Sequence, residues 1–147
     1  MTEANAEVIV KTRGAAWEAL LDQFGDVVAS EAMRFEEVER TMLGVANELA
    51  RQALERELNR MAATYGAEVS VAGTRYRCHA TGTKRYHTLV GAVNVRRASY
   101  RLVGVHNGPT VVPLELEAGI VENATPALAF SVLQGSQSGR CAITKTR

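Results

Sequence analysis

The sequence is poor in cysteine, proline and aromatic residues, and it contains no long apolar run. Its 147 residues include only two cysteines, Cys78 and Cys141. Cysteines so far apart, one of them in a polar tail, indicate a reduced chain of the cytoplasm rather than a disulfide-stabilised secreted one. No apolar stretch approaches the roughly 20 residues that span a bilayer, and residues 1–14 lack a basic segment followed by an apolar one. The sequence therefore predicts neither a membrane partner nor a secretion signal.

Acidic residues are almost missing from the middle of the chain. Residues 66–107 carry seven basic residues and a single acid, Glu68, for a local net charge of +6. Residues 1–65 carry twelve acids against seven basic residues, and the whole chain has a formal net charge of only +1. This separation of charge along the chain indicates a basic surface for a polyanion, most simply nucleic acid.

Before residue 66 the apolar side chains recur every three or four residues, which is typical of amphipathic helices. A first helix is predicted from Ala15 and a second from about Glu31 to Tyr65, with Gly66 as the left-handed residue that ends it. From Phe35 to Leu49 the apolar positions resemble a heptad seam. We therefore expect the long helix to pack against the first helix or against a second copy of itself.

After Gly66 the apolar period changes to two, which predicts an antiparallel meander of four short strands. The expected strands are 67–71, 75–80, 84–90 and 92–103, with turns at Ala72-Gly73, Thr81-Gly82 and Gly91. On the second strand, simple alternation places Arg75, Arg77 and His79 on one face and Tyr76, Cys78 and Ala80 on the other.

The C-terminal part of the chain predicts little regular structure. A short strand interrupted by Pro113 is expected over Thr110 to Leu116. Thr125, Pro126 and Gly135 have the positions of the N-cap, the first residue and the stop of a short helix. The prediction is thus an α+β fold: a helical hairpin with one long helix, a small basic antiparallel meander and a short C-terminal helix. Its regions are 1–65, helical and suited to dimerisation; 66–120, the basic β-meander; 121–135, the short helix; and 136–147, a disordered tail.

No set of residues in the sequence predicts catalysis, a cofactor or a metal site. Gly82-Thr83-Lys84 lacks the earlier glycine of a phosphate-binding P-loop, and Gln137 stands where a nucleophile elbow needs serine. Cys78 and His79 are adjacent strand residues whose side chains point to opposite faces, so they do not readily share one ion. We expect a chain that is not an enzyme.

The basic block is the candidate binding surface, because the planar fork of arginine can hold phosphate groups through two hydrogen bonds. The alternative is that these cations pair with the acidic helices of the same chain or of a partner. Tyr76, Tyr86 and Tyr100 of this block either stack on bases or pack in the core. The side chains assigned to DNA are Arg75, Arg77, Lys84, Arg85, Arg96, Arg97 and Arg101.

Residues 76–135 resemble the N-terminal part of bacterial insertion-sequence transposases related to the mutator-like DDE superfamily. The resemblance rests on the order and spacing of four pieces: Arg85 to Arg97, Tyr100-Arg101, Val112 to Glu115, and Ala118 to Leu128. It implies a DNA-binding part of a transposase, with transposon ends as ligand and with a second copy or a full-length transposase as protein partner.

The chain departs from that family in two respects. Many relatives carry a Cys-x-x-Cys zinc knuckle where this chain has Leu102 to Asn107, so no zinc site is carried over. Relatives also continue into a catalytic domain with a metal-binding acidic triad, and no position here matches the triad. The resemblance thus implies a fragment truncated before the catalytic domain, with the tail after Gly135 as a frameshift product. The alternative is a protein-interaction or dimerisation module that regulates a full-length transposase and binds no nucleic acid.

Overall fold

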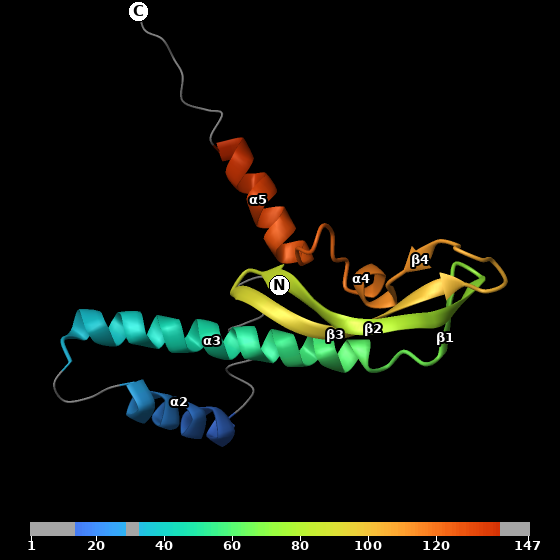
Figure 1. Ribbon diagram of the computed structural model, residues 1–147. Coiled ribbons are helices and arrows are strands. Elements are labelled where there is room, and N and C mark those ends of the chain that lie inside the picture. Colours follow the sequence, from blue (N-terminus) through green and yellow to red (C-terminus); the bar gives the residue numbers. More distant parts are fainter. Residues whose placement is uncertain (1–13, 29–32, 139–147) are drawn as a thin grey trace, which may run out of the picture. The chain divides into compact units, whose positions relative to one another are not determined.

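The computed structural model describes residues 14–28 and 33–138. It has an α+β fold with a four-stranded antiparallel sheet in the order β1-β2-β3-β4, which confirms the predicted class (Figure 1). The chain divides into two compact units, residues 1–47 and 48–147, and the sheet with the packing around it belongs to the second. The elements are α2 (Gly14–Val28), α3 (Phe35–Ala62), β1 (Glu68–Val71), β2 (Thr74–Thr88), β3 (Gly91–Leu102), β4 (Thr110–Val111), α4 (Pro113–Glu117) and α5 (Pro126–Ser138).

Both predicted N-terminal helices are present as α2 and α3, but both ends of α3 differ from the prediction, since the helix begins at Phe35 and not at about Glu31. The helix stops at Ala62, and Gly66 is not among the described glycines with positive φ. The carbonyl of Met61 accepts hydrogen bonds from both the backbone N–H and the hydroxyl of Thr64. Because a side chain supplies this donor, the helix end needs no left-handed glycine.

The predicted turn at Thr81-Gly82 is wrong, because the second and third predicted strands form one continuous strand, β2. Residues on both sides of Gly82 pair with β3, and Gly82 itself lies opposite Arg97. The turn predicted at Gly91 lies at Leu89-Val90, because the strand predicted over 84–90 ends at Thr88 and Gly91 pairs with Thr88 as the first residue of β3. A glycine inside a strand pattern need not mark a turn when a neighbouring strand pairs with the residues on both sides of it. Here β3 is long enough to pair on both sides of Gly82.

A β-bulge between Cys78 and Ala80 shifts the alternation of β2 by one residue. Cys78 pairs with Tyr100, whereas Ala80 pairs with Ser99. Paired residues share a face of the sheet, and an inserted residue moves everything beyond it to the opposite face. Ala80 therefore lies on the face of Arg77, which corrects the prediction that it faces away from it.

The turn between β1 and β2 is the one predicted at Ala72-Gly73. Both residues have positive φ, 49° and 77°, as the two-residue turn of a tight hairpin requires. Only the glycine takes this backbone conformation without cost, so the alanine is held there by the pairing of the flanking strands.

The C-terminal segment is more ordered than the sequence predicts. The expected strand over 110–116 is wrong beyond Val111, because Pro113 begins the short helix α4. Proline lacks the N–H that a strand ladder needs but is well suited to a first helical turn. Helix α5 begins at Pro126 as predicted, but it continues past Gly135 to Ser138. The rest of the predicted disordered tail, residues 139–147, lies outside the described residues.

The core forms where the hairpin, α3 and α4 meet. Tyr86, Val93 and Val95 are fully buried, and Leu58 of α3 and Leu114 of α4 pack with them. These strand residues share one face, since Tyr86 pairs with Val93 and Lys84 with Val95. The apolar area that they remove from water is the main stabilising term of the second unit.

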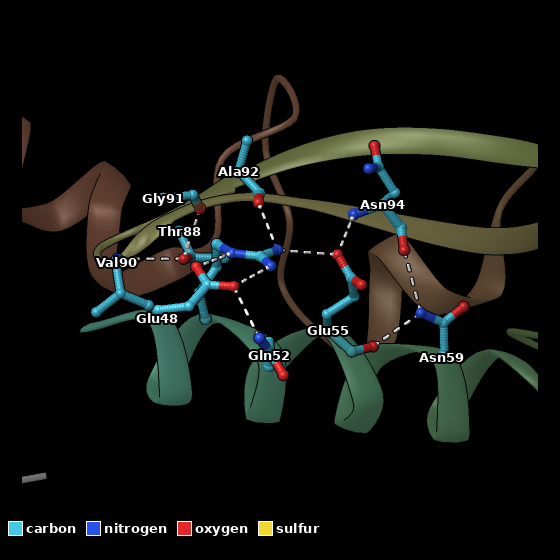
Figure 2. Close-up of polar contacts among 10 residues, drawn as sticks. Glu48, Gln52, Glu55, Asn59, Thr88, Val90, Gly91, Ala92 and Asn94 are labelled. Carbon is cyan, nitrogen blue, oxygen red and sulfur yellow. Dashed lines mark hydrogen bonds and ion pairs between the residues drawn. The ribbon is translucent and has the colours of Figure 1, made fainter. Parts of the chain in front are cut away.

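Side chains of α3 occupy the edge of β3 that no strand covers (Figure 2). Arg51 donates to the Ala92 carbonyl, Glu55 accepts from the Asn94 N–H, and Asn59 donates to the Asn94 carbonyl. Asn59 also accepts from the Arg96 N–H at 2.9 Å. Four helical residues rise about 6.0 Å and two strand residues about 6.6 Å, so every fourth side chain of α3 meets every second residue of β3.

Replacing Asn59 by leucine should lower the free energy of unfolding by about 1–2 kcal/mol, because two backbone groups of β3 lose their partner. Chemical denaturation measures the change. The matched control is Asn47→Leu, on an exposed part of the same helix, where the substitution changes helix propensity alone. Equal effects of both substitutions would contradict the role of Asn59 at the strand edge.

Candidate nucleic-acid interface

The register of the sheet divides the seven predicted DNA-binding cations between its two faces. Cross-strand pairing and the bulge place five on one face and leave Arg85 and Arg96 on the other, where they pair with Asn94 and Thr83. We call the first group the basic face. Its members are Arg75, Arg77, Lys84, Arg97 and Arg101.

The basic face continues the surface that carries the core. Toward the β2–β3 turn this side of the hairpin is covered and holds Tyr86, Val93 and Val95. Farther along the same strands the cations begin, the first being Lys84 opposite the buried Val95. Without the bulge, Arg85 would join Arg77 on this face, and Lys84 would lie opposite.

One carboxylate partly neutralises the outer end of the basic face. Glu68 of β1 accepts hydrogen bonds from both Arg75 and Arg77, whose side chains remain about two-thirds exposed. The hydrogen bond from Arg75, followed by that from Arg77, lowers the pKa of Glu68 below its usual range. Two guanidinium groups share one carboxylate, so an excess of one positive charge remains.

A second carboxylate lies beside Arg97. The Arg97 Nε–H donates to the Tyr86 hydroxyl at 2.9 Å, and that hydroxyl donates to Glu115 Oε1 at 2.6 Å. Arg97 Nε also lies 3.5 Å from the same Glu115 oxygen, and its side chain is 21% exposed. This chain of contacts joins the core, α4 and the basic face, and it fixes where the guanidinium points.

The other predicted cations keep their charge unpaired within the part of the chain that the structure describes. Lys84, Arg85, Arg96 and Arg101 form no ion pair with a described residue. The Nε atom of Arg101 is buried and has no hydrogen-bond partner among the described residues. Arg77, His79 and Arg101 line a shallow depression of about 210 Å³. A buried donor without a partner is costly, and a ligand that accepts a hydrogen bond would remove this cost.

The tyrosines of the basic block do not form a stacking surface. Tyr86 and Tyr100 are buried, at 0% and 1% exposure, so core packing is the correct one of the two alternatives for both. Tyr76 is half-buried on the face opposite the basic face. Cys78 is also half-buried and His79 is exposed. Contacts to a polyanion at this surface must therefore come mainly from cations.

Other kinds of site were sought in the same residues. No three histidine, cysteine or carboxylate side chains within 14–28 and 33–138 come together as metal ligands would. No helix of the described segments has the length and apolar character that crossing a membrane requires.

Comparisons with known proteins give no information on the function of this chain. No protein-family model matches the chain, and neither the curated proteins nor the solved structures contain a significant match.

Two features of the site give no signal in the sequence. The bulge is set by pairing with β3 and not by a motif in β2. Tyr86 and Glu115 are 29 residues apart, so nothing in their spacing predicts that they meet or that they hold Arg97. By contrast, simple alternation along the strand predicted that Arg75 and Arg77 share a face, and the pairing of the strands agrees.

The tyrosines make stability fall at alkaline pH. Burial, reinforced by hydrogen bonds to Glu117 and Glu115, raises the pKa values of Tyr65 and Tyr86 to about 12. Because an unfolded tyrosine ionises near pH 10, the unfolded state loses protons first and unfolding becomes easier between about pH 10 and pH 12. Phenolate absorbance of the folded chain should show late-ionising groups, and Tyr86→Phe should remove one. A titration that Tyr86→Phe leaves unchanged would contradict this assignment.

Proposed function

We propose that this chain binds DNA through the basic face of its β2–β3 hairpin. The observation that carries the proposal is the gathering of five cations on one side of the hairpin, with two nearby carboxylates to offset them. Several cations along one side of a sheet suit a phosphate backbone, whose charges repeat along the strand. The proposal assigns no catalytic step to this chain.

The basic face favours backbone contacts over base recognition. Arginine and lysine neutralise phosphates, whereas a reading of bases needs side chains that enter a groove or stack. Since Tyr86 and Tyr100 are buried, stacking at this surface has little support. The resemblance to insertion-sequence transposases adds that the DNA would be a transposon end, and that a second copy or a full-length transposase would bind beside it.

Salt titration of duplex binding tests the proposal. Each phosphate that is neutralised contributes about −0.9 to the slope of log K against log salt. Lys84→Gln with Arg101→Gln should therefore make the slope shallower by up to about 1.8, the value for two phosphates that are no longer neutralised. Fluorescence anisotropy with a labelled duplex measures the slope.

The matched control removes the same number of charges from the opposite face, as Arg85→Gln with Arg96→Gln. It should change the slope by clearly less, because these side chains face away from the bound duplex. Equal losses from both faces would show that overall charge, and not the basic face, attracts DNA. A wild-type chain that fails to bind duplex at low salt would overturn the proposal.

A second candidate function is self-assembly through α3, and the exposure of the two ends of its predicted apolar seam favours it, whereas Val38, Met42 and Val45 between them are half-buried. Phe35 is 75% exposed and Leu49 is 55% exposed, which is unusual for two members of one seam. Sedimentation velocity should then show a dimer without DNA, and Phe35→Glu with Leu49→Lys should convert it to a monomer. A monomer at every concentration, with DNA binding intact, would leave only the first function.

A further inference from the structure

A depression lies in the middle of the basic face, where the hairpin carries its smallest residues. Two cross-strand pairs form its floor, Ala80 with Ser99 and Gly82 with Arg97. Its volume is about 230 Å³, several times the roughly 30 Å³ that a water molecule takes up in the liquid. The lining residues are Ala80, Thr81, Gly82, Thr83, Lys84, Arg97 and Ser99.

Gly82 keeps this depression open, and the backbone does not require a glycine there. Its φ lies outside the positive range that only glycine tolerates well, and an added Cβ would meet no atom within 4 Å. A glycine inside a strand costs stability relative to residues with a side chain. In strands such a residue often marks a place where a ligand comes close to the backbone.

The walls of the depression carry free donors. Arg97 uses Nε to hold the Tyr86 hydroxyl, and its two terminal nitrogens form no hydrogen bond to a described residue. Lys84 is half-buried and also lacks an ion pair among the described residues. Glu115 offsets one of these two charges, so the depression keeps an excess of one positive charge.

We infer that this depression is a subsite for one phosphate group of the DNA backbone, bound by Arg97 and Lys84 over the floor that Gly82 leaves open. That the phosphate belongs to DNA rests on the proposed function. That the depression binds a phosphate group rests on the residues that line it. The terminal nitrogens of arginine match two phosphate oxygens, and lysine adds a point charge beside them. Tyr86 and Glu115 fix the guanidinium before the ligand arrives, which reduces the entropy lost on binding.

Filling the floor with Gly82→Val tests the subsite without removing a charge. Valine favours strands and meets no neighbour at its Cβ, so the hairpin should keep its fold, which circular dichroism checks. The slope of log K against log salt for duplex DNA should become shallower by about 0.9, the share of one phosphate. Affinity at low salt should fall roughly tenfold, as expected for a lost charge-assisted contact.

The matched control is Thr74→Val at the start of β2, an exposed residue on the opposite face that does not line the depression. It should leave affinity and slope unchanged. If Gly82→Val also leaves both unchanged while Lys84→Gln with Arg101→Gln weakens binding, the subsite is wrong and the proposed function stands.

A second arm uses inorganic pyrophosphate and needs no DNA. Pyrophosphate should raise the midpoint of thermal unfolding of the wild-type chain, and this shift should vanish in Gly82→Val. A pyrophosphate shift without any duplex binding would support the subsite and overturn the proposed function. The same shift in the wild-type and Gly82→Val chains would overturn the subsite.

Discussion

The register of the β2–β3 hairpin is the constraint on which the rest of the structure depends. One extra residue between Cys78 and Ala80 sets which side chains lie together beyond it. Toward the turn, that register directs Tyr86 and Val93 into the core, and farther along it brings Lys84 to the side of Arg77. A shift by one residue would expose the core residues and disperse the basic face at the same time. Packing and charge therefore cannot change independently in this hairpin.

The long strands β2 and β3 pair with each other, and each has one further edge whose backbone groups need partners. Different parts of the chain supply these partners. Side chains of α3 take the place of a strand beside Ala92 to Arg96, and β4 continues along β3 at Tyr100. On the outer edge of β2, β1 pairs near Arg77, and the segment before α5 pairs at His87. The edge between these contacts borders the depression at Gly82. Among the described residues no strand pairs with this stretch of β2, so its backbone groups stay open at the edge.

Tyr86 connects the buried core with the basic face. Its ring is part of the buried core, while its hydroxyl connects Glu115 to Arg97. The buried hydroxyl is tolerated because it both accepts a hydrogen bond from Arg97 and donates one to Glu115, and it holds these two partners in one geometry. The position of a cation on the basic face thus follows from how α4 packs on the sheet. Disturbing α4 should therefore alter the basic face even though α4 carries no cation.

The sequence by itself determined the α+β class, the two helices before the sheet, the Ala72-Gly73 turn and the start of α5 at Pro126, because each depends on local periodicity or on the chemistry of one residue. It also determined the separation of charge. The tertiary structure alone decided that Thr81-Gly82 continues a strand, that Ala80 changes face and that Glu115 reaches Arg97. Those outcomes depend on partners from distant parts of the chain, and the free energy of such pairings exceeds local preference. Composition counts the cations, but only the pairing of strands decides which of them act together.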